Sequence, residues 1–185
     1  MGYRNGTYIA FHANGTTDPT ASDIKYYSLL KAWTQLEDDD FSFINSHEKT
    51  AAVRDSSLRE TLKTRLVKRL LNSKHLLLIV GETTREDTDW VPFEIRYAIE
   101  ECEIPVIAAY TVFDKPIYNP SALSAYWPSA LKSRIDNGSA SVIHIPFRKE
   151  PIRDAIGQFN HNAFPKGGGL GYYSKKAYRN FGLEP

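Results

Sequence analysis

Two unbroken apolar runs constrain the fold of this chain more than any other feature. The runs "HLLLIVG" (75–81) and "IPVIAAY" (104–110) each have the length of one strand, and neither alternates with polar residues. A strand that is apolar at nearly every position is buried on both faces, which is typical of the middle of a parallel sheet. Such a sheet needs helices on both faces, so the chain is predicted to fold as an α/β domain.

The rest of the chain supplies the alternation of strands and helices that this fold requires. Further strands are expected at Thr7–His12, Phe41–Asn45 and Ser141–Phe147. Helices are expected after a cap at Ser22, after the capping-box pair Ser57 and Glu60, around 88–102, in part of 118–137, and at Glu150–Phe159.

This alternation indicates a doubly wound, flavodoxin-like parallel sheet of five strands. The expected strand order is 2-1-3-4-5, with Leu77, Ile79, Val106 and Ile107 buried at the centre. We expect one domain over residues 1–160. Residues 161–185, "HNAFPKGGGLGYYSKKAYRNFGLEP", have little core periodicity and are predicted to form a C-terminal extension that is flexible or docks a partner.

Charge and composition exclude several functional classes. Lys and Arg number 23 and Asp and Glu 22, and this net charge of +1 gives no basis for binding nucleic acid or a membrane. A single Cys excludes a disulfide framework, and the five His have no metal-ligand spacing. No apolar run has the length of a membrane-spanning helix, and the start lacks a signal-peptide pattern. We therefore expect a cytoplasmic protein without a metal.

The predicted strand order also places a candidate binding crevice. The order reverses between strands one and three, and ligands of such folds bind there, outside the carboxyl ends of the strands. Candidate substrate-binding residues follow strand one (Phe11, His12, Ala13 and Asn14), follow strand two (Ser46), or precede the next helix at the same edge (Asp55).

The helix after the third strand borders this crevice and has an unusual flank. Its apolar stripe is formed by Val91, Ile95, Ala98, Ile99 and Cys102. Beside the stripe, one turn apart, lie Trp90, Glu94 and Tyr97. Glu94 is expected to flank the core rather than fill it, and Trp90 and Tyr97 can offer planar surfaces to a substrate base. Asp89 is expected to cap this helix.

Several of these segments resemble a known family. "TYIAFH" (7–12), "FSFINSHEKTAAVRDSS" (41–57) and "DWVPFEI" (89–95) are similar to the TIR-like domain family that includes the Thoeris anti-phage proteins. The most specific element is the Trp-Val-x-x-Glu-Ile pattern at 90–95, and the resemblance covers residues 7–159. Enzymatic members cleave NAD between nicotinamide and ribose with a glutamate on this helix, which implies that Glu94 is catalytic. Relatives are expected to have an acidic residue after strand one, where this chain has His12.

The implied chemistry suits a single carboxylate. Loss of nicotinamide leaves an oxocarbenium-like ribose, which a fixed carboxylate stabilises. The departing nicotinamide ring begins cationic and needs little acid help. The resemblance therefore implies that NAD is the substrate, and no cofactor is expected. The resemblance implies a cyclic ADP-ribose-type signal that a separate effector protein senses. A phage-derived trigger and a second copy of the chain, in a homo-oligomer, are the other expected partners.

Two alternatives from other classes stay open. The first is a non-catalytic TIR-like interaction module, in which the aromatic residues mediate assembly. The second is a nucleoside deoxyribosyltransferase-like enzyme, because that class shares the fold and places a carboxylate at a sugar carbon. Incubation with NAD and, separately, with deoxynucleosides would distinguish the three hypotheses.

Overall fold

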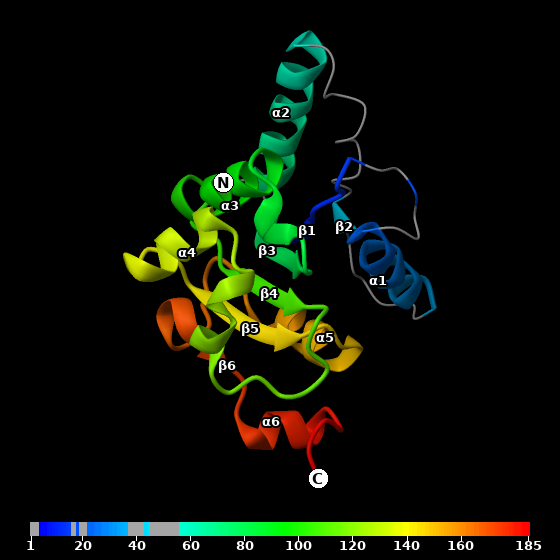
Figure 1. The fold of residues 1–185 in the computed structure, drawn as a ribbon, viewed down its shortest axis with the longest axis vertical. Helices are drawn as coiled ribbons and strands as arrows, with labels where there is room; N and C mark the ends of the chain where they lie inside the picture. Colours follow the sequence, from blue (N-terminus) through cyan, green and yellow to red (C-terminus); the bar gives the residue numbers. More distant parts are fainter. Residues whose placement is uncertain (1–3, 16–17, 19–21, 37–42, 45–55) are drawn as a thin grey trace.

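A six-stranded sheet forms the centre of the computed structural model, which describes residues 4–15, 18, 22–36, 43–44 and 56–185 (Figure 1). Its order is β2-β1-β3-β4-β5-β6, and every neighbouring pair is parallel. The strands are β1 (Gly6–Ala10), β2 (Phe43–Ile44), β3 (Ser73–Val80), β4 (Val106–Tyr110), β5 (Val142–Pro146) and β6 (Gly171–Tyr172). The predicted five-stranded sheet in the order 2-1-3-4-5 was therefore one strand short.

The two apolar runs form neighbouring strands inside the sheet, as predicted. Leu77 of β3 pairs with Ile107 of β4, and Leu76 pairs with Val106. The side chains of Leu77, Val106 and Ile107 are all 0 % exposed, and so is that of Ile79. This confirms the predicted centre of the core. It also explains the runs, because both faces of β3 and β4 are covered by helices.

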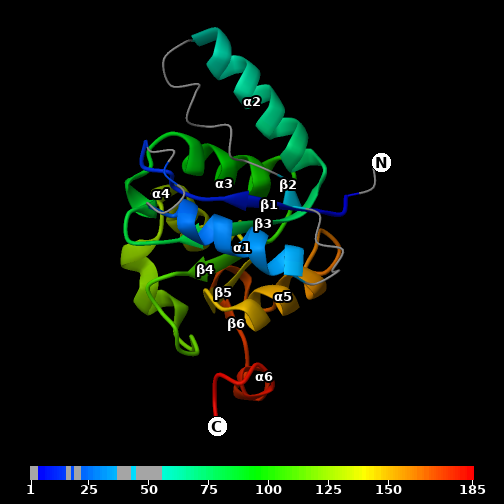
Figure 2. The ribbon, with the colours of Figure 1, turned by 90° about the vertical axis from the view of Figure 1, so that its right-hand side faces the viewer.

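The helices form two layers that cover opposite faces of the sheet (Figures 1 and 2). One face carries α2 (Ser56–Leu71), α3 (Trp90–Glu100) and α4 (Ser129–Asp136), and the other carries α1 (Ile24–Leu36) and α5 (Lys149–Gln158). The crossover to α1 and the crossover to α3 leave the sheet on opposite sides, which places the switch point between β1 and β3. None of the helices within the described ranges is long and apolar enough to cross a membrane.

The C-terminal extension is packed against the rest of the domain. It adds β6 at the edge of the sheet and ends in α6 (Lys175–Asn180). Tyr173 and Tyr178 are buried and belong to the core cluster on the α1–α5 face. Gly171 permits this arrangement, because a Cβ atom there would lie 2.6 Å from the backbone oxygen of Val142.

Two histidines inside the sheet are structural. Nδ1 of His75 donates to the backbone oxygen of Phe159 at 2.8 Å, and its Nε2 lies 2.8 Å from the Thr7 hydroxyl. Nε2 of His144 donates to the backbone oxygen of Gly169 at 2.9 Å. Burial lowers the pKa of each imidazole to about 4. Both rings are therefore neutral hydrogen-bonding groups at neutral pH.

Candidate functional site

The start of α3 is held by the loop that follows β3. The carboxylate of Asp87 accepts from the backbone N–H of Asp89 at 2.8 Å and of Trp90 at 3.0 Å. Asp89 precedes the helix but its side chain makes no capping hydrogen bond. Asp89 thus occupies the N-cap position, as expected, but the side chain that caps the start of the helix is that of Asp87. The carboxylate of Asp87 instead satisfies N–H groups that have no partner within the helix.

Glu94 lies inside the protein, between α3 and the sheet. Its side chain is 0 % exposed, and the hydroxyl of Tyr8 in β1 donates to its Oε1 at 2.5 Å. The expectation that Glu94 flanks the core was wrong. Neighbouring helices α2 and α4 lie on either side of α3, so the buried part of α3 is wider than its apolar stripe. Trp90, on the same flank, is accordingly buried as well.

The contact between Glu94 and Tyr8 has a clear electrostatic consequence. Burial raises the pKa of Tyr8 well above its usual value, and the charge of Glu94 and the hydrogen bond to it raise that pKa further. The phenol therefore stays protonated and donates to the carboxylate. A charge-assisted hydrogen bond of this kind offsets part of the cost of burying a carboxylate. Tyr8 thus holds Glu94 in one orientation.

A first cavity lies at the carboxyl edge of the sheet. It has a volume of about 320 Å³ and is lined by the start of α1 and by the residues after β3 and β4. Ser22, Asp23, Thr83 and Thr111 contribute to its wall. His12, half-buried and two residues beyond β1, places Nδ1 3.3 Å from the Thr83 hydroxyl. A cavity is therefore present at the predicted edge of the sheet, with His12 beside it, but its described wall includes no residue of α3.

Asp23 is the residue of this edge that the sequence did not single out. It is 4 % exposed, and the Thr84 hydroxyl donates to its Oδ2 at 2.8 Å. A Cβ atom on Gly81 would lie 2.1 Å from Oδ1 of Asp23, so only glycine fits there. Burial raises the pKa of Asp23, while the Thr84 hydrogen bond and nearby His12 oppose that rise.

The predicted cap at Ser22 is one residue early. Asp23 directly precedes α1, and its backbone oxygen accepts from the N–H groups of Tyr26 and Tyr27. The hydroxyl of Ser22 instead donates to the backbone oxygen of His12 at 2.7 Å. An Asp before the first apolar residue of a helix is a recognisable capping signal. The contact between Asp23 and Gly81, in contrast, joins distant parts of the chain and cannot be predicted from a local sequence pattern.

The other predicted substrate-binding residues are spread over the edge and the core. Phe11 is buried and stacks on Tyr27 with ring centroids 5.0 Å apart. Ala13 is half-buried, and Asn14 is exposed with a positive φ of 50°. Ser46 and Asp55 lie outside the described residues. Among the described residues of this group, His12 contacts the cavity wall through Thr83.

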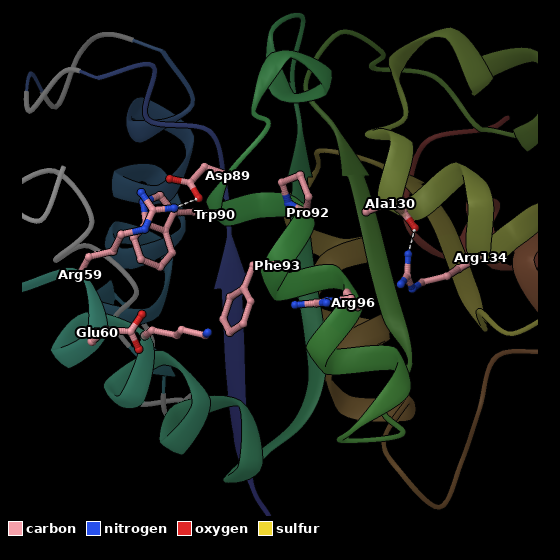
Figure 3. A pocket seen from close by; sticks show the side chains of 10 residues that line it. Arg59, Glu60, Asp89, Trp90, Pro92, Phe93, Arg96, Ala130 and Arg134 are labelled. Atoms are coloured by element: carbon pink, nitrogen blue, oxygen red, sulfur yellow. Dashed lines mark hydrogen bonds and ion pairs between the residues drawn. The ribbon is translucent and has the colours of Figure 1, made fainter. Parts of the chain in front are cut away.

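The two predicted aromatics of α3 lie near a second cavity, of about 390 Å³, between α2, α3 and α4 (Figure 3). Trp90 and Phe93 form part of its wall. Tyr97 packs on Phe93 with ring centroids 5.8 Å apart. Glu94 is absent from the described walls of both cavities. Trp90, Glu94 and Tyr97, which were predicted to act together, therefore do not line one common cavity among those described.

Within the described ranges, no three His, Cys, Asp or Glu side chains are close enough to hold a metal ion. The polar groups gathered here are instead a buried carboxylate held by a phenol, and an aspartate, a histidine and threonine hydroxyls at a cavity. Such groups can bind sugar hydroxyls and stabilise positive charge.

Comparison with known families identifies the chain. The sequence model described as "Thoeris protein ThsB, TIR-like domain" matches residues 8–116. The match begins in β1 with Tyr8 and extends past β4, so it includes His12, Asp23 and Glu94. It spans more than half of the 185 residues. The chain belongs to the TIR-like domain family of the Thoeris protein ThsB.

Proposed function

We propose that this protein cleaves NAD between nicotinamide and ribose and releases a cyclic ADP-ribose-type nucleotide as a signal in anti-phage defence. The observation that carries the proposal is Glu94. It is a fully buried carboxylate on α3, within the part of the chain that matches the family. Burying a carboxylate costs free energy, so such groups are candidates for function. NAD is the substrate, and the reaction needs no cofactor.

In this proposal Glu94 acts on the ribose as the bond to nicotinamide breaks. Positive charge develops on the ribose, and a fixed carboxylate in a site shielded from water stabilises it strongly. The hydroxyl of Tyr8 positions the carboxylate by donating to Oε1 at 2.5 Å. Shielding from water also favours attack by a nucleophile of the adenosine half over hydrolysis. A cyclic product follows from that preference.

The burial of Glu94 adds a requirement to this mechanism. Because the carboxylate is fully buried, the proposal requires that the groups covering it move before a substrate can reach it. We therefore assign this conformation to the resting protein. A phage-derived trigger would uncover Glu94, and a separate effector protein would sense the product.

The test supplies NAD to the purified protein with and without an extract of phage-infected cells, and resolves the products by chromatography and mass. The proposal predicts a product one water lighter than ADP-ribose, formed only with the infected extract. Extract without the protein is the control. Linear ADP-ribose as the sole product would replace the signalling role with NAD depletion. Cleavage of deoxynucleosides in a parallel reaction would instead favour a deoxyribosyltransferase.

The complete burial of Glu94 also favours a second candidate function, a non-catalytic interaction module. There the carboxylate has a structural role, which includes accepting a hydrogen bond from Tyr8. Glu94→Gln retains that acceptor, so it would leave phage protection intact in cells that carry the protein and its effector. Under the enzymatic proposal the same substitution abolishes protection while the protein still folds.

A further inference from the structure

The cavity between α2, α3 and α4 has a wall rich in cations. Arg59 and Lys63 come from α2, Arg96 from α3 and Arg134 from α4. Two carboxylates, Glu60 and Asp89, are the acidic residues of the same wall. The wall therefore carries two more positive than negative charges, although the chain as a whole has a net charge of only +1. Figure 3 shows Arg59, Arg96 and Arg134 on the three helices around the cavity, with Arg59 turned toward Asp89 and Arg96 toward Phe93.

Two of these cations are already paired. Arg59 forms an ion pair with Asp89, and its guanidinium lies 5.2 Å from the centroid of the Trp90 ring. Arg134 forms an ion pair with Glu100 at 2.5 Å, and its side chain is 12 % exposed. These contacts fix the two ends of the cavity wall.

The other two cations have no carboxylate partner within the described ranges. Nζ of Lys63 lies 5.6 Å from the centroid of the Phe93 ring, and the guanidinium of Arg96 lies 5.9 Å from the same centroid. Both residues are exposed. Cations from two different helices thus converge on one ring, where their charges repel each other. An anion that contacts both would relieve this repulsion.

The same wall contains two buried donors that find no acceptor within the described part of the chain. Nε1 of Trp90 and Nε of Arg134 are buried and have no hydrogen-bond acceptor among the described residues. The whole Trp90 side chain is deeply buried, with only 8 % of the residue exposed. A buried donor that lacks an acceptor destabilises the fold, because it has lost its hydrogen bonds to water. Oxygen atoms of a bound anion are the kind of group that satisfies such donors.

We propose that this cavity binds a phosphate-bearing anion of nucleotide size, with the phosphates held by Lys63 and Arg96. Its volume of about 390 Å³ lies in the range of small-molecule sites. An arginine binds phosphate through two parallel hydrogen bonds and a lysine through a point charge. The rings of Trp90 and Phe93 provide apolar surface for the rest of the ligand. The site is separate from Glu94, which is not part of the described wall.

Calorimetry on the full chain tests this proposal with ADP, inorganic pyrophosphate and adenosine at constant ionic strength. ADP and pyrophosphate are expected to bind, and adenosine to bind at least about tenfold more weakly, because it lacks the charge. Replacing both cations (Lys63→Ala with Arg96→Ala) should weaken ADP binding at least about tenfold. Both side chains are exposed, so the double variant should keep its melting temperature.

Two matched variants show whether ADP binds at this cavity. Lys68→Ala removes the same charge from an exposed position of α2 outside the described wall, and should leave ADP affinity unchanged. Glu94→Gln should also leave ADP affinity unchanged. ADP binding at this cavity can therefore be tested whether or not the proposed NAD cleavage is correct. The proposal is overturned if ADP does not bind, if the double variant binds it normally, or if adenosine binds as well as ADP. A polyglutamate peptide is titrated in the same way. If it binds more tightly than ADP, the proposal of a nucleotide-sized ligand is overturned in favour of an acidic protein partner.

Discussion

The two buried carboxylates of the described chain differ in what surrounds them. Glu94 belongs to α3, on one face of the sheet, and Asp23 precedes α1, on the other. Each accepts a hydrogen bond from a hydroxyl, Glu94 from Tyr8 and Asp23 from Thr84. Of the two, Asp23 lines a described cavity and Glu94 does not. Burial alone therefore does not distinguish a carboxylate that acts on a ligand from one that stabilises the fold.

The two carboxylates are also supported in different ways. Glu94 is held by a side chain of a central strand, so its position depends on the sheet itself. Asp23 is held by the loop after β3, where the absence of a side chain on Gly81 leaves room for it. Substitutions of the supporting residues, rather than of the carboxylates, test these two arrangements most cleanly.

The largest effect on stability is expected for Gly81→Ala. The new Cβ atom would lie 2.1 Å from Oδ1 of Asp23, so one of the two must move. Overpacking of this kind lowers the free energy of unfolding by up to about 3 kcal/mol. Urea denaturation measures the change. Gly157→Ala is the matched control, since nothing lies within 4 Å of a Cβ there and α5 should become slightly more stable.

A double-mutant cycle sharpens this prediction. In an Asp23→Ala background most of the cost of Gly81→Ala should disappear, because the clashing oxygen is gone. Equal costs in both backgrounds would show that Asp23 does not occupy the space beside Gly81.

Tyr8→Phe is expected to have the next largest effect. It removes the hydroxyl that donates to Glu94 but keeps the ring in the core. Loss of a hydrogen bond to a buried charged group lowers the free energy of unfolding by about 2 kcal/mol. Tyr126→Phe is the control, because no acceptor of its hydroxyl exists among the described residues. A similar, small change in both variants would contradict the structural role of Tyr8.

The smallest effect is expected for Asp23→Asn, and it should depend on pH. Because burial raises the pKa of Asp23 above 3.8, the folded protein binds this proton more tightly than the unfolded chain. Below pH 3.8 the protonated Asp23 therefore contributes its full stabilisation to the wild-type fold. This contribution is lost as the pH rises through the folded pKa, so the wild type loses stability relative to the Asn variant. Unfolding measured from about pH 3 to about pH 7 checks the sign. The opposite slope would mean that Asp23 is stabilised as an anion.

Much of the fold could be predicted from the sequence because its signals are local. The apolar runs at 75–81 and 104–110 indicate buried strands without knowledge of their neighbours. The strand β6 could not be predicted in this way. Only Gly171 and Tyr172 pair with β5, and a two-residue strand in a glycine-rich segment has no periodicity.

The candidate site was predictable only in part. The pattern at 90–95 identified Glu94, and strand order identified the edge at His12. The burial of Glu94 depends on how α2 and α4 pack beside α3, which the periodicity of α3 alone does not contain. Asp23 was missed because its contacts with Gly81 and Thr84 join segments about 60 residues apart.

NAD cleavage by Glu94→Gln, measured beside wild type and Asp23→Asn after activation by infected-cell extract, tests the central claim most directly. Gln is similar in size to Glu and can still accept from Tyr8, so the fold should be retained. Glu94→Gln is expected to lose at least about 100-fold in rate, because charge stabilisation is removed. Asp23→Asn should lose less. Cleavage by Glu94→Gln at the wild-type rate would contradict the assignment of Glu94 as the catalytic carboxylate.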